Sequence, residues 1–451
     1  MNTDTILIYI LLIVPVLLSL SYFGNLSQII GKIGSILEAI IAFIALTIPL
    51  GEYSYFNINS VNRILIISVS IVYTFSVFFA STYHRGIKEP RHLKLHYSLM
   101  HLFVFTMLFT LAINDFGLMW IGIEATTASS ALLLIIERQK TEIEAAWRYV
   151  LIVSTGLTLA LISVILIYLD YHTLNSVSII NAGHSPSFIL TVAGATALVG
   201  FGTKIGIFPM HTWLPDAHGE APSEISAMFS GILLPVAAYV LYRFYLATYS
   251  GRLEIIFMIF ILATLVFVAL IMPSQKNIKR MFAYSTMENM ALITLGLITG
   301  GLALVGALLI ILTHAFGKSG AFFSSGNILK IYGTKKIGSI RGLRNKSPST
   351  AMSLLASSLA VTGAPPFTAF VGELLIIYQL ISNGSLLAVF ITVVCIFIIS
   401  ISLMQKVTVM IFDGNTDKDE VAGLDKTQKY VAGLSVLFAF SIIFVYLGGF
   451  I

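Results

Sequence analysis

The 451-residue chain has little charge and a single cysteine. Only 10% of its residues are Asp, Glu, Lys or Arg, whereas 57% are hydrophobic, and the mean hydropathy is +0.94. A water-soluble domain of this composition would have too few charged residues to cover its surface. The lone Cys395 excludes an internal disulfide and any thiolate cluster for iron–sulfur or zinc. The composition therefore predicts a multi-span membrane protein.

Motifs for cofactors and for soluble chemistry are missing as well. We expect no strands, and no glycine-rich phosphate loop or dinucleotide fingerprint is present. The longest polar connections, near residues 84–96, 330–347 and 413–429, are each under about 20 residues and too short to form a core. We therefore expect no cofactor, no metal and no catalytic centre in this chain, so any enzyme activity would belong to partner subunits.

Apolar runs of membrane-spanning length fill the rest of the sequence. A bilayer core of about 30 Å needs roughly 20 apolar residues per helix, and lipid gives backbone groups no partners, so helices are the expected spans. The first run has no basic segment or small-residue cleavage site, which predicts a retained helix and not a signal peptide. The prediction is an all-α integral membrane protein with about 14 transmembrane helices, near residues 5–22, 29–50, 62–83, 95–113, 115–136, 144–169, 188–207, 222–247, 253–273, 281–299, 301–325, 348–381, 385–411 and 430–451.

Lys and Arg are shared unevenly between the loops. Only Arg63, Arg243 and Arg252 follow even-numbered spans, whereas loops after odd-numbered spans are rich in basic residues, at Lys32 and near 85–94, 138–140, 276–280, 330–346 and 418–429. By the positive-inside rule the second group faces the cytoplasm, which predicts a multi-pass cell-membrane protein with both termini on the outer side. The pI near 9.0 then reflects topology and not nucleic-acid binding.

Several charged side chains fall inside the predicted spans. A charge at the bilayer centre costs about 2.5–3.5 kcal/mol on insertion scales, so such residues usually face protein or water and often serve transport. His314 precedes Lys318 by four residues, on the same helix face. The candidate proton-translocation residues are therefore Glu124, Arg148, Lys204, Glu288, His314, Lys318, Glu373 and Lys406.

Each of these charges also has a structural interpretation. Deep in a span, Glu124, Lys204 and Glu373 would form buried ion pairs. Glu288 lies nearer a basic loop and would pair with Arg280 or Lys279. Arg148 and Lys406 lie near helix ends, so their long side chains would extend to the membrane interface.

Two groups of histidines could in principle bind a metal. The first also contains two acids, and its members are His211, Asp216, His218 and Glu220. Such side chains are legitimate ligands, but their irregular spacing on a loop favours helix caps and loop hydrogen bonds. The second group, His92, His96 and His101, stands near a helix start and is better explained as interfacial.

The spacing of the charges suggests an internal duplication. Glu124 and Lys204 are 80 residues apart, and Glu288 and Glu373 are 85 apart. Spans 4–8 and 9–13 therefore look like two copies of one five-helix unit, and an odd number of spans inserts the second copy upside down. We divide the chain into helices 1–3 (1–94), a first repeat (95–250), an inverted second repeat (251–412) and a C-terminal loop and helix (413–451).

Prolines predict broken helices in spans 7 and 12. Pro209 has no N–H, and its ring would clash with the carbonyl of Ile205 beside Lys204; Pro365 and Pro366 precede Glu373. A break at membrane depth exposes backbone groups to an ion path. Desolvation favours a neutral lysine and a nearby carboxylate favours a charged one, so a lysine between acids can take up and release a proton. The PDAHGEAP run after Pro209 is expected to be a turn.

Four segments resemble the motifs of a known family: FGTKIGIFPMHTWLPDAHGEAP, THAFGKSGAFF, AYSTMEN and GAPPFTAFVGE. They are similar to those of the antiporter-like, proton-translocating membrane subunits shared by respiratory complex I, Mrp sodium/proton antiporters and group 4 membrane-bound hydrogenases. The wording around PMHTWLPDAH looks closest to the F-type membrane component of hydrogenase-4. The resemblance covers residues 95–410 and implies a fourteen-helix fold with two inverted five-helix units and a hydrated central axis.

The resemblance also implies roles for individual residues. Glu124 matches the glutamate that pairs with the family's first lysine, Lys204 matches that lysine, and Glu373 matches the terminal residue after the proline break. His314 and Lys318 match the histidine and lysine between the two units. One position departs from the pattern, because several members have a second central lysine where GILLPVAAY has Pro235.

The function implied by the resemblance is movement of protons, or of other cations, coupled to electron transfer in partner subunits. The implied partners are other membrane subunits and a soluble redox arm of an NADH dehydrogenase-like or hydrogenase complex, with lipid around the chain and no nucleic acid. Two alternatives stay open, a stand-alone cation/proton antiporter and a membrane component of an inorganic-carbon uptake complex. The identity of co-purifying proteins would separate them.

Overall fold

The structure is a computed structural model that describes residues 3–23, 27–84, 90–135, 140–183, 187–414 and 426–447. Among these residues, twelve helices are long and apolar enough to cross a membrane. They coincide with predicted spans 1–11 and 13, so the multi-span helical fold is confirmed, while the count of fourteen and the inverted repeats stay predictions. The loop residues Arg85, Lys88, Arg138 and Lys418 lie outside the described residues.

The chain divides into two compact units. Unit 1 comprises Met1–Val77, His84–Trp213 and Ile232–Ile259, and unit 2 comprises Phe78–Tyr83, Leu214–Gly231 and Phe260–Ile451. The four-part division proposed from sequence stays a prediction.

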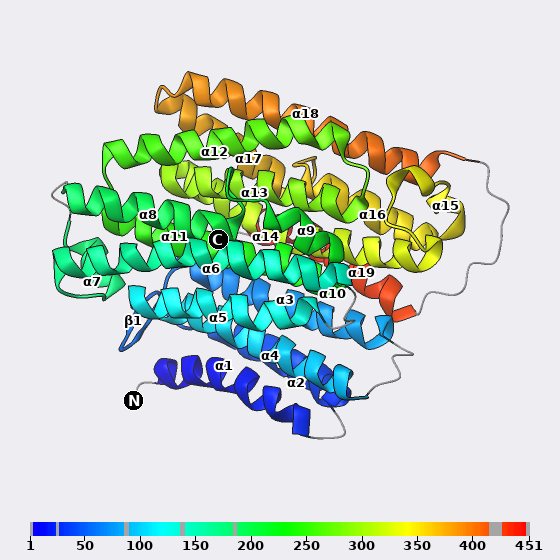
Figure 1. Ribbon diagram of the computed structural model, residues 1–451, viewed down its shortest axis with the longest axis horizontal. Helices are drawn as coiled ribbons and strands as arrows, with labels where there is room; N and C mark the ends of the chain where they lie inside the picture. Colours follow the sequence, from blue (N-terminus) through cyan, green and yellow to red (C-terminus); the bar gives the residue numbers. More distant parts are fainter. Residues whose placement is uncertain are drawn as a thin grey trace. The chain divides into compact units, whose positions relative to one another are not determined.

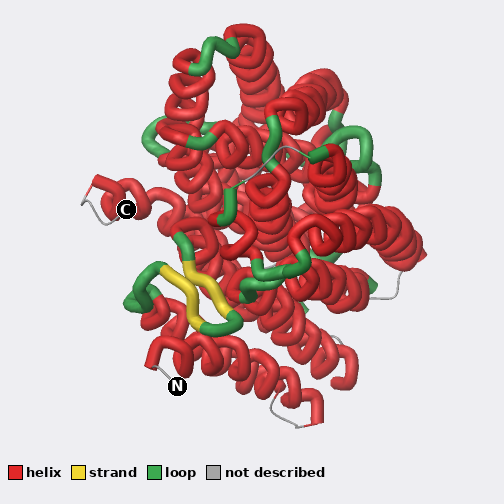
Figure 2. Tube along the Cα trace, turned by 90° about the vertical axis from the view of Figure 1, so that its left-hand side faces the viewer, coloured by secondary structure: helices red, strands yellow, loops and turns green. Residues whose placement is uncertain are grey.

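In the described residues of unit 1 the regular elements are helices and one short hairpin (Figure 2, yellow). Strands β1 (Gly51–Tyr53) and β2 (Phe56–Ile58) pair antiparallel, with Gly51 opposite Ile58. The expectation of no strands was therefore wrong, because this polar connection after the second span satisfies its backbone groups with a two-residue turn. The helices are α1 (Thr3–Ser19), the turn η1 (Leu20–Phe23), α2 (Ser27–Ala45), most of α3 (Ser60–Tyr83), α4 (Pro90–Ala112), α5 (Phe116–Leu134), α6 (Lys140–Tyr171), α7 (Ser176–Asn181), α8 (Phe188–Ile205), α11 (Leu234–Thr248) and the first part of α12 (Gly251–Ile271).

The regular elements among the described residues of unit 2 are all helices, joined by non-helical segments. Helix α13 is buried at every residue except Arg280 and Thr299, whereas α18 presents exposed side chains such as Leu387 and Phe397, as expected of a lipid-facing helix. The elements are α9 (Trp213–Glu220), α10 (Ser223–Met228), the π-helical η2 (Phe229–Leu233), the end of α12, η3 (Met272–Ser274), α13 (Ile278–Thr299), α14 (Gly301–Tyr332), η4 (Ile337–Ser339), α15 (Leu343–Lys346), α16 (Pro348–Val361), α17 (Thr368–Ser382), α18 (Leu386–Phe412) and α19 (Lys426–Leu447).

In each unit, a close helix pair that carries a candidate ionisable residue depends on glycine. In unit 1, α6 and α8 run side by side (Figure 1), and a Cβ at Gly200 would lie 2.6 Å from the Cβ of Ala160. In unit 2, α14 packs on α17, and a Cβ at Gly372 would lie 2.6 Å from the carbonyl oxygen of Gly306. Small residues let membrane helices approach closely, and these two pairs carry Lys204 and Glu373.

The predicted helix break in span 7 is confirmed. Helix α8 ends at Ile205, because Gly206 adopts a left-handed φ of 88° that glycine tolerates without strain. The N–H groups of Gly206 and Ile207 both donate to the carbonyl oxygen of Gly202 at 2.9 Å. The chain therefore leaves the helix three residues before Pro209, and the proline lies in the non-helical segment.

The segment after this break was predicted incorrectly. The PDAHGEAP run is not a simple turn, because Trp213–Glu220 forms helix α9. Pro215 lies in the first turn of α9, where backbone N–H groups have no partner within the helix and a proline costs little.

The predicted break in span 12 is confirmed as well. Helix α16 ends at Val361 and α17 begins at Thr368. The residues between them contain Pro365 and Pro366, and Gly363 has a φ of 64°. The freed carbonyl of Thr362 accepts a hydrogen bond of 3.3 Å from the Ser400 hydroxyl of α18.

Candidate ion-translocation site

Lys204 is held in unit 1 by hydroxyl groups. It lies in the last turn of α8 and its side chain has no exposed surface. Its Nζ donates to Thr127 Oγ1 of α5 at 2.8 Å and to the Tyr149 hydroxyl of α6 at 2.6 Å. The Tyr149 hydroxyl also shares a hydrogen bond of 2.7 Å with Ser130 Oγ. Three helices thus enclose the ammonium.

The broken end of α8 stabilises the lysine. A cation is favoured at a helix C-terminus because the last carbonyl groups carry partial negative charge. One of these carbonyls, that of Thr203, accepts a hydrogen bond of 2.8 Å from the indole of Trp213. The Trp213 ring also packs 4.7 Å from the Tyr149 ring, centroid to centroid. Trp213, which follows the break, therefore helps to fix the Tyr149 phenol that binds Lys204.

Glu124 has a hydroxyl partner of its own. Its Oε1 accepts a hydrogen bond of 2.8 Å from Ser154 Oγ of α6, and its buried Oε2 has no partner among the described residues. Glu124 lies one turn before Thr127 on α5, so the acid and the lysine's ligand share a helix face. In the described part of the chain no salt bridge joins Glu124 to Lys204. The direct pair implied by the resemblance is replaced by separate hydroxyl contacts.

Lys318 occupies a similar environment in unit 2. It is fully buried on α14, and its Nζ donates to Ser285 Oγ of α13 at 2.6 Å and to the Phe282 carbonyl at 3.3 Å. The same Ser285 hydroxyl lies 3.5 Å from Glu288 Oε2, which accepts from it. One hydroxyl therefore connects this lysine to an acid.

Glu288 does not form an ion pair with Arg280 or Lys279, which was its structural interpretation. Arg280 instead forms a salt bridge with Asp216, N to O 3.3 Å. The ammonium of Lys279 donates to the Ala221 carbonyl at 2.8 Å. Glu288 is 1% exposed and faces Ser285, so it lies with Lys318.

His314 explains what Pro235 does. In a π-helix the carbonyl of Ser230 would accept from the N–H five residues on, but that residue is Pro235, which has no N–H. His314 Nε2 lies 3.0 Å from this carbonyl oxygen, which requires the proton on Nε2 because a carbonyl can only accept. The buried Nδ1 has no partner among the described residues. The proline thus creates a backbone acceptor for His314, one turn from Lys318.

Glu373 lies at the second helix break. It stands in the second turn of α17 and is half-buried. Its carboxylate fills the space that a side chain at residue 363 would need, beside Gly363 in the non-helical segment. The acid therefore packs directly against the broken backbone.

Arg148 and Lys406 have contacts of another kind. Arg148 is exposed on α6 and pairs with Glu144 one turn earlier, N to O 2.5 Å. The Nζ of Lys406 donates to the carbonyls of Met272 at 2.6 Å and Pro273 at 2.8 Å, beyond the end of α12. These contacts are with a surface acid and with backbone carbonyls, and the transport roles of both residues stay predictions.

The acids of the first candidate metal group have basic partners. Asp216 pairs with Arg280, and Glu220 pairs with Lys335, N to O 3.4 Å. His218 stacks on Phe322 with ring centroids 5.1 Å apart. These contacts favour the interpretation of this segment as helix and loop stabilisation.

Sequence reasoning missed Glu38 and the hydroxyls. Glu38 is fully buried on α2, and neither carboxylate oxygen has a partner among the described residues. Its position inside the apolar stretch 29–50 was a usable signal, of the kind that identified Glu124. The Ser, Thr and Tyr ligands gave no such signal, because neutral hydroxyls are common in membrane helices and can bond to their own backbone.

The arrangement in each unit suits proton exchange. Both lysines are bound by neutral hydroxyls without a fixed counter-ion, and a hydroxyl both donates and accepts. In unit 2 a proton can therefore leave the Lys318 ammonium through the Ser285 hydroxyl toward the Glu288 carboxylate. In this exchange one N–H bond breaks, one carboxyl O–H bond forms, and lysine and glutamate both become neutral.

The chain resembles known proteins in sequence and in fold. Residues 113–400 match the family described as NADH:quinone oxidoreductase/Mrp antiporter, TM. The chain is 32% identical over 393 residues to the Hydrogenase-4 component F homolog of Methylacidiphilum infernorum, which covers 82% of each protein. It is 27% identical to NADH-quinone oxidoreductase subunit N of Desulforudis audaxviator, covering 73% of this chain and 67% of that one.

Two solved structures share the fold along nearly the whole chain. A chain of the archaeal membrane-bound sulfane sulfur reductase superposes with a TM-score of 0.87 at 23% identity, covering 100% of this chain and 96% of that one. A chain of the Mrp complex from Dietzia sp. DQ12-45-1b gives 0.87 at 20% identity, with 100% and 95% covered. With the family match over most of the sequence, these findings show that the chain belongs to the NADH:quinone oxidoreductase/Mrp antiporter family of transmembrane subunits.

Proposed function

We propose that this chain translocates protons as one membrane subunit of a redox-driven complex, of the complex I or group 4 hydrogenase type. The observation that carries the proposal is that each unit buries one lysine completely and binds its ammonium with hydroxyls, and that a helix supplying one of those hydroxyls also carries an acid. Burying charge is expensive without compensation. A structural lysine would be expected to pair directly with a carboxylate, and neither does so among the described residues.

In the proposed path, Glu124 and Lys204 exchange protons in unit 1, and Lys318 and Glu288 do so in unit 2. His314 serves the second pair, since it lies one turn from Lys318 and has a free ring nitrogen. Glu373 would be the terminal group, beside the second helix break. Protons suit this set of side chains better than sodium, which prefers several oxygen ligands.

The partners proposed are other membrane subunits and a soluble redox arm. The names of the relatives support this proposal, because one relative is a subunit of an NADH-quinone oxidoreductase and another is a homologue of a hydrogenase component. We also propose that both termini face the outer side of the membrane. We further propose that predicted spans 4–8 and 9–13 are inverted repeats. The parallel between the α6–α8 and α14–α17 pairs supports the repeats.

The test is to purify the chain in mild detergent with its native partners and to reconstitute the complex in liposomes. Proton-gradient formation and electron transfer by the co-purified redox subunits are then measured separately. We expect Lys204→Ala and Glu124→Gln each to abolish gradient formation while electron transfer stays measurable. Arg252→Gln is the matched control, because it removes an exposed charge that lies outside the proposed path. Gradient formation by both variants at the wild-type rate would refute the proposal.

The co-purified subunits decide the wider assignment. A soluble redox arm supports the proposal. A set of membrane subunits with no redox protein would favour a stand-alone cation/proton antiporter, and a soluble inorganic-carbon enzyme would favour carbon uptake. Either of these two results would contradict the coupling to electron transfer.

A further inference from the structure

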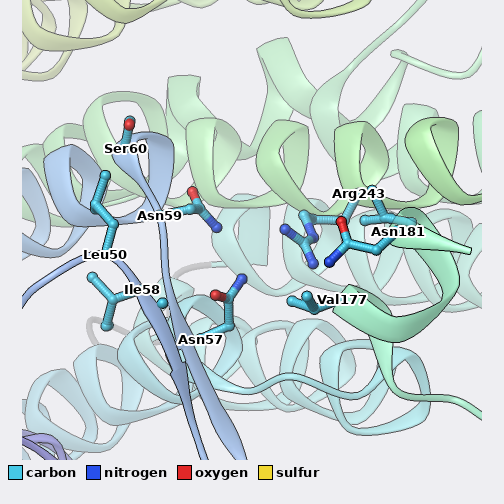
Figure 3. A pocket seen from close by; sticks show the side chains of 10 residues that line it. Leu50, Asn57, Ile58, Asn59, Ser60, Val177, Asn181 and Arg243 are labelled. Carbon is cyan, nitrogen blue, oxygen red and sulfur yellow. The ribbon is translucent and has the colours of Figure 1, made fainter.

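A pocket of about 360 Å³ opens in unit 1, between the β-hairpin, the start of α3, α7 and the end of α11 (Figure 3). It takes no part in the proposed proton path. Arg243 and three asparagines form its polar side, and Leu50, Ile58 and Val177 line it elsewhere. The question is what ligand such a mixed site would bind.

Arg243 is a buried cation that has no counter-ion among the described residues. It is 7% exposed, and its Nη2 donates to Ser176 Oγ at 2.8 Å. Its Nε is buried without a partner, and no salt bridge reaches it among the described residues. A guanidinium carries five N–H donors, and leaving a buried one unsatisfied is costly. The site is therefore incomplete without an acceptor.

A chain of hydrogen bonds fixes the position of Arg243. Ser176 Oγ donates to Asn114 Oδ1 at 2.6 Å, and Asn114 Nδ2 donates to Glu52 Oε1 at 2.8 Å. The Glu52 carboxylate therefore lies three hydrogen bonds away from the guanidinium. This arrangement orients the arginine but leaves its charge to be neutralised by something else.

Two asparagine amides face the same space as Arg243. Figure 3 shows the side chains of Asn57 and Asn181 converging with the guanidinium. Asn57 is 6% exposed, and neither amide has a side-chain hydrogen bond in the described part of the chain. The third asparagine is already occupied, since Asn59 donates to the Tyr239 hydroxyl at 2.9 Å. Two free amides beside a cation can bind the oxygens of an anion.

We propose that this pocket binds the phosphate group of an anionic phospholipid headgroup. A guanidinium fork matches phosphate oxygens and can bind two of them at once. The asparagine amides would bind the remaining oxygens or the hydroxyls of the headgroup. The apolar side favours a lipid over free phosphate, because Leu50 is 54% exposed at the rim and can contact the glycerol backbone and first methylenes.

The experiment uses the purified complex in nanodiscs of phosphatidylglycerol or of phosphatidylcholine. Native mass spectrometry after graded detergent washing measures the phospholipid retained per complex. We expect retention of phosphatidylglycerol by the wild type and a loss of at least tenfold in apparent affinity with Arg243→Gln. Arg252→Gln is the control, because Arg252 is an exposed arginine outside the pocket. Asn181→Leu gives a second variant at an exposed pocket residue, for use should Arg243→Gln fail to assemble.

Each outcome decides for or against the proposal. Retention that falls with Arg243→Gln or Asn181→Leu and not with Arg252→Gln supports it. Equal retention by all variants overturns it. Displacement of the lipid by millimolar inorganic phosphate would instead assign the pocket to free phosphate, and an acidic side chain of a partner protein seated on Arg243 would assign it to a contact between subunits; both results contradict a lipid site.

Discussion

Lys204 in unit 1 and Lys318 in unit 2 are both fully buried and both donate to hydroxyl groups, but they stand in different relations to their acids. In unit 2 the Ser285 hydroxyl contacts Lys318 Nζ and Glu288 together. In unit 1 the lysine uses Thr127 and Tyr149, whereas Glu124 uses Ser154.

The two units therefore arrange the same groups, a lysine, hydroxyls and an acid, in two different ways. A shared hydroxyl lets a proton pass from amine to acid through one group. Separate hydroxyls require a side-chain movement or a bridging water before the proton can pass. We therefore expect unit 2 to exchange its proton locally and unit 1 to act as a gated step.

The largest effect is expected from Lys204→Arg and Lys318→Arg. Arginine keeps the positive charge but does not lose its proton in proteins, so both variants should lower proton translocation at least about tenfold, a barrier increase of about 1.4 kcal/mol. The measurement is the gradient formed in proteoliposomes at equal electron-transfer rate. Assembly of the complex is checked by size-exclusion chromatography. Normal translocation in an assembled arginine variant would show that the lysine serves as a fixed charge. It would contradict the proposal that this lysine exchanges a proton.

Removing the hydroxyls of Ser285 and Ser154 should lower proton translocation by unequal amounts. Ser285→Ala removes the partner of both a lysine and an acid, and a hydrogen bond to a charged group contributes about 1.5–3 kcal/mol, so we expect a fall in translocation of about tenfold or more. Ser154→Ala removes only the contact with Glu124 and should cost about threefold, or ~0.7 kcal/mol. Initial rates of gradient formation give both values.

The control for this pair keeps the hydroxyl. Ser285→Thr should restore most of the rate, because its Oγ1 can occupy the same position on α13. Equal losses for Ser285→Ala and Ser154→Ala would mean that the shared hydroxyl has no special role in unit 2.

Alanine at the glycine contacts of the α6–α8 and α14–α17 helix pairs should lower thermal stability to a similar extent. A methyl group at Gly200 or Gly372 would stand 2.6 Å from its neighbour, and overpacking of this kind costs about 1–3 kcal/mol. Gly200→Ala and Gly372→Ala should therefore each lower the apparent Tm of the purified complex by several degrees. Gly433→Ala in α19 is the control, since a Cβ there meets no atom within 4 Å. Destabilisation in one pair only would argue against equivalent packing of α6–α8 and α14–α17.

The sequence could predict the features that depend on local chemistry. The spans follow from apolar length, the buried lysines from the cost of charge in lipid, and the two breaks from proline. Even here the end of α8 is set by Gly206 and not by Pro209. These features need no knowledge of which helices are neighbours.

The ligands of the lysines could not be predicted, because they depend on helix packing. Nothing in the sequence places Tyr149 of α6 beside Lys204, which follows it by 55 residues. The role of Pro235 was equally hidden, since the freed carbonyl of Ser230 acquires a meaning only once α14 brings His314 to it. The pocket around Arg243 combines four structural elements and had no sequence signal beyond one arginine near the end of a predicted span.

The smallest effects are expected at the peripheral basic residue of each unit. The side chains of Arg148 and Glu144 are 56% and 64% exposed, and surface pairs contribute about 0–1 kcal/mol, so Arg148→Gln should change neither translocation nor Tm measurably. Lys406→Gln removes two hydrogen bonds to backbone carbonyls and should lower the free energy of unfolding by about 1 kcal/mol with translocation intact. Both are measured in the reconstituted complex, by gradient formation and thermal melting. A loss of translocation above about threefold, or ~0.7 kcal/mol, in a variant with normal Tm would place that residue in the proton path. The path would then extend beyond the buried lysine of that unit, to the surface through α6 in unit 1 or along α18 in unit 2.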